Sequence, residues 1–217
     1  MSTTIMRHPD PATLMSYAAG SLTEPLAAVA AAHISMCDEC RAELADMELL
    51  GAALLSGAEQ VPVGAAMQAP HRPTDVSVSE VARSRAEPSD RLPAPIAAAF
   101  HLSFDAIPWK RLGPGVLHYR LPLSHGVEGD LRLLKIGPGR VMPDHGHGGG
   151  ELTLVLDGAY NDATGSYRRG DIQDVDETVE HTPVADKETG CVCLIASERP
   201  ARFKGLVGKL LQPWTGM

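Results

Sequence analysis

The stretch His33-Ile-Ser-Met-Cys37-Asp-Glu-Cys40 decides how the first part of this chain is interpreted. It places one imidazole and two thiols at the spacing His-x3-Cys-x2-Cys. On one continuous helix, these three side chains would share a single stripe. If a helix instead ends here and a new one begins after a short turn, the Cys-x-x-Cys pair can still grip one ion. Both arrangements favour a tetrahedral zinc site, which needs a fourth ligand.

His8 is the best candidate for that fourth ligand, because the first sixty residues hold no other His or Cys. The set His8, His33, Cys37 and Cys40 would form a closed, structural Zn²⁺ site. The alternatives are a redox Cys-x-x-Cys pair or two buried thiols. A redox pair has no need of a histidine four residues ahead of it, and no βαβ pattern surrounds the motif. The pattern therefore favours zinc.

Three helices are predicted around this motif. Asp10 can cap a first helix over residues 11–19, with Pro at its first turn. A second helix is expected over residues 23–33 and a third over residues 38–55, where Gly57 ends the apolar spacing. Their shared core is thin and rich in Ala, so a metal ion would have to hold the helices together.

The charge of the chain is concentrated at its N-terminal end. Residues 1–60 hold eight acidic and two basic side chains, which places about −6 of the formal net charge of −8 there. An acidic surface repels phosphate backbones, which argues against direct nucleic-acid binding and fits a basic protein partner.

No uninterrupted apolar run is long enough to span a membrane, and residues 1–10 lack the pattern of a signal peptide. We therefore expect a cytoplasmic protein.

The composition divides the chain into two parts. Residues 1–90 form the helical part, including a Pro-rich linker from about residue 60, in which residues 76–85 can form one short helix. Residues 96–217 are predicted to form an antiparallel β-barrel. Asp157-Gly158 is a plausible hairpin turn in it, and a helix-like apolar face begins at Phe203. The expected fold class is a multidomain α + β chain. The predicted strands are short runs at residues 116–121, 130–136, 151–156 and 191–196.

A second group of metal-ligand residues lies in the β part, in the pattern Gly139-x5-His145-x-His147-x3-Glu151-x6-Gly158. On a strand, His145 and His147 point to the same face. Glu151 begins the next predicted strand and can turn its carboxylate onto the same ion. The three side chains therefore form a second candidate metal site.

This pattern resembles the first motif of the cupin superfamily at every spacing. The second cupin motif is retained in part, in Gly170-x5-Asp176-x-Thr178-x2-His181-x3-Ala185. The resemblance implies that His181 is the fourth ligand of a His3Glu site, a set that suits zinc, manganese, iron or nickel. Asp176, Thr178 and Ala185 depart from the family pattern, and a degenerate cupin without metal is the alternative.

The N-terminal residues carry a resemblance of their own. His8-Pro9-x4-Leu14-x2-Tyr17-Ala18-x-Gly20-x-Leu22, followed by His33-x3-Cys37-x2-Cys40, is similar to the zinc-binding anti-sigma domain. With a cupin behind it, the chain resembles the ChrR-type anti-sigma factors. That resemblance implies a non-enzymatic protein that holds an extracytoplasmic-function sigma factor inactive and releases it under singlet oxygen or related oxidative stress.

An enzyme is the competing class of function. A His3Glu site is a common catalytic set in cupins, so the chain could be an oxygenase or isomerase with an N-terminal zinc-binding regulatory domain. The N-terminal part favours the regulatory interpretation, because such an enzyme has no evident need of it. Thiolates and imidazoles are also side chains that oxidants attack readily, which fits an oxidant-responsive regulator.

Overall fold

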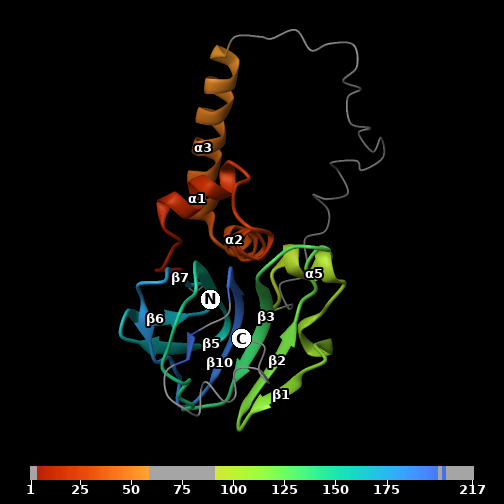
Figure 1. The fold of residues 1–217 in the computed structure, drawn as a ribbon, viewed down its shortest axis with the longest axis vertical. Helices are drawn as coiled ribbons and strands as arrows, with labels where there is room; N and C mark the ends of the chain where they lie inside the picture. Colours follow the sequence, from red (N-terminus) through yellow and green to blue (C-terminus); the bar gives the residue numbers. More distant parts are fainter. Residues whose placement is uncertain (1–3, 59–90, 200–201, 204–217) are drawn as a thin grey trace.

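The computed structural model describes residues 4–58, 91–199 and 202–203. Three helices stand on one end of a β domain, and a fourth covers part of the same end (Figure 1). In these ranges, no helix combines the length and the apolar character needed to cross a membrane. The helix expected at residues 76–85 and the tail after Phe203 lie outside the described residues. The helices are α1 (Pro11–Ala18), α2 (Glu24–Met36), α3 (Asp38–Gly57) and α5 (Ala94–Phe100).

The three N-terminal helices begin within one residue of their predicted starts, whereas α2 and α3 extend to Met36 and Gly57, beyond their predicted ends at residues 33 and 55. The side chain of Asp10 accepts a hydrogen bond from the Ala12 N–H at 2.8 Å and caps α1. Between α2 and α3, Cys37 adopts an extended conformation, with φ −112° and ψ 112°. A helix end, a one-residue junction and a new helix are therefore the arrangement of the His-x3-Cys-x2-Cys stretch.

The β domain consists of antiparallel strands in two sheets. The larger sheet runs in the order β1-β2-β3-β10-β5-β6, with β7 and β9 also paired to β5, and the smaller runs β11-β4-β8. The prediction of an antiparallel β domain is confirmed, although across the described residues the strands do not join into one closed ring. A short 3-10 helix (Phe104–Ala106) precedes the first strand. The strands are β1 (Lys110–Gly113), β2 (Val116–Arg120), β3 (Asp130–Ile136), β4 (His145–Gly146), β5 (Glu151–Asp162), β6 (Gly165–Arg168), β7 (Ile172–Val175), β8 (Glu180–His181), β9 (Val184–Ala185), β10 (Cys191–Ser197) and β11 (Arg202–Phe203).

The predicted hairpin turn at Asp157-Gly158 is wrong, because both residues lie inside the long strand β5. Gly158 has φ +69°, and a Cβ there would lie 2.1 Å from the carbonyl oxygen of Gly190. The register between β5 and β10 shifts at this level, so the pair marks an irregularity in the strand. The hairpin turn follows Asp162 instead, whose carboxylate accepts the N–H groups of Thr164 and Gly165.

Helix α2 packs into the hydrophobic core of the β domain (Figure 1). Its residues Leu26, Val29, Ala30 and Ala32 belong to the same buried cluster as side chains from β3, β5, β7 and β10. A Pro-rich linker such as the one predicted here usually separates units between which few contacts cross. That expectation is wrong for α2, because the folding of both parts buries one continuous apolar surface.

Shortening one α2 side chain should therefore destabilise the β domain as well as the helices. Val29 is fully buried, and we expect Val29→Ala to lower the free energy of unfolding by about 2 kcal/mol. Denaturant unfolding followed by helical circular dichroism and by the near-ultraviolet signal of the stacked Tyr160–Tyr167 pair checks this. Leu54→Ala, at an exposed position of α3, is the control. An unchanged tyrosine transition in Val29→Ala would contradict the shared core.

Candidate metal centres

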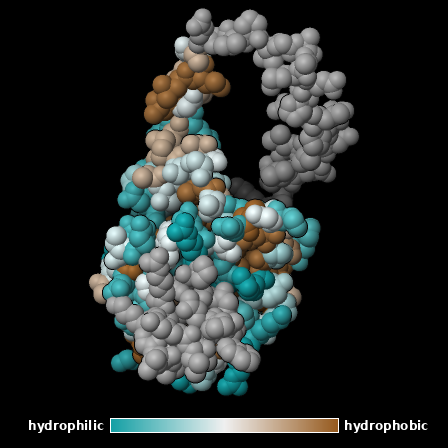
Figure 2. Space-filling model, in the orientation of Figure 1, coloured by the Kyte–Doolittle hydropathy of each residue, from teal (hydrophilic) through white to brown (hydrophobic). Residues whose placement is uncertain are grey.

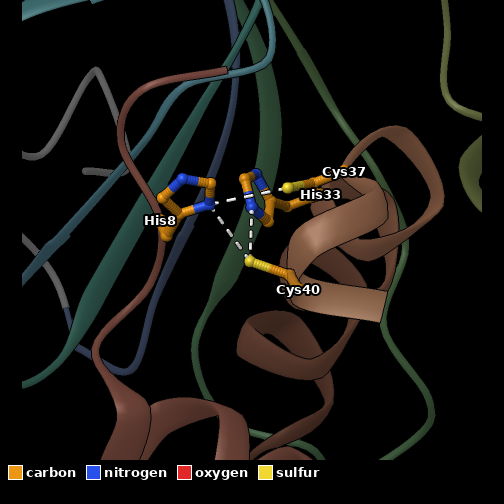
Figure 3. A group of neighbouring side chains, drawn as sticks. All are labelled: His8, His33, Cys37 and Cys40. Carbon is orange, nitrogen blue, oxygen red and sulfur yellow. Dashed lines mark hydrogen bonds between the residues drawn. The ribbon is translucent and has the colours of Figure 1, made fainter. Parts of the chain in front are cut away.

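The four N-terminal ligand candidates converge on one point, with His8 on one side and His33, Cys37 and Cys40 on the other (Figure 3). Each offers one ligand atom, and these atoms all lie within 4.8 Å of one another. Three different pieces of chain supply them: the segment before α1, the last turn of α2, and the start of α3 with its preceding junction. The group is His8, His33, Cys37 and Cys40, and it is called the N-terminal cluster below.

Each imidazole of the N-terminal cluster turns one nitrogen toward the thiols and the other toward an oxygen. His33 Nε2 lies 3.2 Å from Cys40 Sγ, while its Nδ1 lies 3.0 Å from the Gly170 carbonyl oxygen. His8 Nδ1 lies 3.3 Å from Cys40 Sγ, and its Nε2 lies 3.5 Å from a Glu39 carboxylate oxygen. Metal-bound histidines have this arrangement, in which the outer nitrogen donates to an oxygen and fixes the tautomer of the ring.

The protonation states of the N-terminal cluster follow from its burial. Burial lowers the pKa of His33 to about 4, so at neutral pH the ring is uncharged and can offer a lone pair. Burial, together with the neighbouring Cys37, raises the pKa of the Cys40 thiol to about 12. A metal ligand must be a thiolate, so a cation binding here has to displace that proton. Two thiols and two suitably oriented imidazoles fit tetrahedral zinc.

A second group of four lies in the β domain, and it is called the cupin cluster below. Its ligand atoms also lie within 4.8 Å of one another. The pairing of β4 with β8 places His145 opposite His181, and their Nε2 atoms are 3.2 Å apart. His147 stacks on His145 with ring centroids 5.4 Å apart, and Glu151 enters from the first residue of β5. The cupin cluster is His145, His147, Glu151 and His181.

The surroundings of the cupin cluster fit a metal ion. His145 Nδ1 lies 2.8 Å from the Pro143 carbonyl oxygen, and His181 Nδ1 lies 2.7 Å from Asp162 Oδ2. His147 is buried, and neither of its ring nitrogens has a hydrogen-bond partner among the residues that the structure describes. Burial lowers the pKa of His147 to about 4 and raises that of Glu151 to about 7. A buried, neutral imidazole with free nitrogens is unfavourable unless something binds it.

The two clusters differ in their access to space. A cavity of about 370 Å³ adjoins the cupin cluster, and His145, Glu151 and His181 line it. Apolar side chains such as Leu134 and Ile195 line other parts of its wall. An ion in the cupin cluster could therefore take a further small ligand from the cavity, whereas the four side chains of the N-terminal cluster would by themselves complete a tetrahedral set.

The structure brings the eight predicted residues together in two groups of four. That these groups hold metal stays a prediction. No feature of the sequence pointed to Asp162, which the structure places against His181. Burial alone would raise the pKa of Asp162, but hydrogen bonds from His181, Thr164 and Gln173 lower it below its ordinary value. The motif Asp-x-x-Gly indicates only a turn, and no local signal connects Asp162 with a histidine nineteen residues later.

These features define a class of protein in which a helical unit with a His2Cys2 cluster is joined to a cupin-type β domain with a His3Glu cluster. Residues 97–200 match the family described as the ChrR cupin-like domain. The chain is 40% identical over 215 residues to anti-sigma-E factor ChrR of Cereibacter sphaeroides, covering 97% of this chain and 98% of that protein. It therefore belongs to the ChrR family of anti-sigma factors, and the predicted resemblance is confirmed.

A solved structure agrees with this assignment. The anti-sigma ChrR structure, from a crystal of Rhodobacter sphaeroides SigE in complex with ChrR, matches with a TM-score of 0.73 and 39% identity. The match covers 89% of this chain and 99% of that one. Both relatives are regulators by name, which favours the regulatory interpretation over the enzyme alternative.

The contact between Asp162 and His181 generates a prediction about the cupin cluster. We expect Asp162→Ala to lower the metal affinity of this cluster by about ten-fold or more, because His181 loses the oxygen that orients its ring. Metal retained against increasing chelator concentration measures the effect. Asp186→Ala is the control, since Asp186 likewise accepts N–H groups in a turn, from Glu188 and Thr189. Equal losses in both variants would contradict a specific role for Asp162.

Proposed function

We propose that this chain is an anti-sigma factor that binds an extracytoplasmic-function sigma factor and holds it inactive. The 40% identity to an anti-sigma factor over nearly the full length, together with the likeness to a chain crystallised with SigE, carries this proposal. The protein would act in the cytoplasm, where RNA polymerase uses sigma factors, and would contact the sigma factor without binding nucleic acid itself.

An exposed apolar surface on α3 supports a protein partner. Leu49, Leu50, Leu54 and Leu55 occupy the outer half of this helix and are 53–78% exposed. Figure 2 shows the apolar colour gathered at the free end of the helix. Grouped, exposed leucines of this kind mark a site that a partner covers. We assign this α3 surface to the sigma factor.

The charge of α3 also fits a basic partner. The helix carries five acidic side chains and only Arg41 as a basic one. Opposite charge steers association and favours partners with a basic surface, as proteins that bind promoter DNA have. The acidic residues are Asp38, Glu39, Glu43, Asp46 and Glu48.

We propose that the N-terminal cluster binds Zn²⁺ and that the ion has a structural role. It would join the segment carrying His8 to the junction of α2 and α3, from which the α3 surface projects. The cupin cluster would bind a second ion, Zn²⁺ or else manganese, iron or nickel, which its nitrogen and oxygen ligands suit equally.

We further propose that residues 1–90 inhibit the sigma factor and that residues 96–217 are needed for its release under singlet oxygen or related oxidants. Release requires a state of the protein that binds the sigma factor less tightly. The thiols of the N-terminal cluster and the imidazoles of both clusters are side chains through which an oxidant can produce such a state. The packing of α2 against the β domain supplies physical contact between the two parts.

Removal of the thiols tests the structural role of zinc. We expect the double variant Cys37→Ser, Cys40→Ser to lose about one zinc per chain and to lose inhibition of the sigma factor, because two of four ligands are gone. Elemental analysis and a sigma-dependent reporter measure the two effects. The matched control replaces Cys191 and Cys193, two buried thiols outside both clusters, by Ser. Full inhibition by the metal-depleted Cys37, Cys40 variant would refute the proposal.

Introducing negative charges on the α3 surface tests whether the sigma factor docks there. We expect Leu54→Asp, Leu55→Asp to weaken sigma-factor binding by at least about ten-fold, since a buried carboxylate at an interface loses its hydration. Copurification with the sigma factor measures this binding, and unfolding curves check that the fold is retained. Val141→Asp, an exposed apolar position of the β domain, is the control. Unchanged copurification of the leucine variant would show that the partner docks elsewhere.

A further inference from the structure

One short segment of the β domain, residues 170–174, contacts the surroundings of both metal clusters. It comprises Gly170, Asp171 and the first three residues of β7. Figure 1 shows β7 at the end of the β domain that faces the helices. This segment is called the β7 link below, and its contacts fall into two sets.

The first set anchors the chain on both sides of His8. Asp171 is 1% exposed, and its Oδ1 accepts hydrogen bonds from the Met6 and Arg7 N–H groups at 2.7 and 3.1 Å. The Ile172 N–H donates to the Arg7 carbonyl oxygen at 3.2 Å. On the far side of His8, Asp174 Oδ2 accepts the Asp10 N–H at 3.0 Å. The β domain therefore supplies backbone hydrogen bonds that hold the segment presenting His8 on both sides.

The same link also orients the other imidazole of the N-terminal cluster. The Gly170 carbonyl oxygen lies 3.0 Å from His33 Nδ1 and accepts its proton in the tautomer that leaves Nε2 for a metal. Gly170 has φ +91°, and a Cβ on it would lie 2.6 Å from Ile5 Cγ1. The link therefore approaches the N-terminal segment as closely as a glycine allows.

The second set of contacts runs to the cupin cluster. Gln173 Nε2 donates to Asp162 Oδ2 at 2.8 Å, and the same oxygen lies 2.7 Å from His181 Nδ1. The link is also hydrogen-bonded along β5, the strand that begins with Glu151. From His181 to His33, the path thus consists of two side chains, Asp162 and Gln173, and three further residues of backbone.

We propose that the β7 link couples the two clusters, with Asp171 as the residue that positions His8. The cation affinity of the N-terminal cluster is then set partly by the β domain and depends on the state of the cupin cluster. This inference rests on the proposed metal binding and deepens it, since it names how a change at the cupin cluster reaches the part that binds the sigma factor.

Cobalt provides a readout that separates the clusters. Co²⁺ bound by thiolates has a sulfur-to-metal absorption band, and the cupin cluster contains no sulfur ligand. In Co²⁺-loaded full-length protein, the loss of this band against increasing chelator concentration measures the N-terminal cluster alone. The cobalt bound by the cupin cluster is the total cobalt minus the amount that the absorption band assigns to the N-terminal cluster.

We expect Asp171→Ala to lower cobalt retention at the N-terminal cluster by about ten-fold or more, as the loss of outer contacts to metal ligands does elsewhere. Asp171→Asn keeps one acceptor for Met6 and Arg7 and should restore part of the retention. Asp186→Ala, which removes a turn-capping carboxylate far from the N-terminal segment, should leave the N-terminal band unchanged. Wild-type retention in Asp171→Ala, or an equal loss in Asp186→Ala, would overturn the positioning role.

The coupling itself is tested by a double-mutant cycle. We expect His181→Ala to lower N-terminal cobalt retention by about five-fold, the lower end of typical coupling between sites. It should have little further effect in a Gln173→Ala background, because that substitution already removes the hydrogen bond between Asp162 and the β7 link. Independent, multiplicative effects of the two substitutions would overturn the coupling. A wild-type protein without any sulfur-to-cobalt band would instead refute the proposed N-terminal metal site, so the two failures are distinguishable.

Discussion

The imidazole of His33 is the group on which the arrangement of this molecule depends. The ring is fully buried, and its two nitrogens face different parts of the protein, Nε2 toward Cys40 and Nδ1 toward the Gly170 carbonyl of the β domain. Helix α2 cannot rotate about its axis without losing one of these contacts. Because only Cys37 separates the end of α2 from the start of α3, the same ring also restricts the direction of α3.

The two clusters have different chemical characters that match different tasks. The N-terminal cluster has sulfur ligands, lies between pieces of chain far apart in sequence, and has the closed ligand set of sites that stabilise a fold. The cupin cluster offers only nitrogen and oxygen atoms and borders a cavity, so a small molecule in the cavity could reach an ion bound there. The N-terminal cluster therefore suits a structural role, and the cupin cluster suits a role in responding to a signal.

How much could be predicted from the sequence depended on how far apart the partners lie along the chain. The three N-terminal helices were predicted correctly, and the motif spacings indicated which His, Cys and Glu side chains lie together, because periodicity, caps and motif spacing are local properties. Asp157-Gly158 misled, since a positive φ serves a strand irregularity as well as a turn. Asp162 and Asp171 were missed because each gains its role only when folding brings it to a distant segment, as when Asp171 meets Met6.

The shared core of α2 and the β domain also restricts how the molecule can change shape. Drawing the helical part away from the β domain would expose Leu26 and Val29 to water, at a cost of about 1.5–3 kcal/mol for each such side chain. It would simultaneously strip the His8 segment of the backbone pairing supplied by Ile172. A hinge motion that separates the two parts therefore has a high cost in free energy. A twist or slide in which the two parts stay packed costs less free energy than separation. A change in the β domain would therefore reorient the helical part without detaching it.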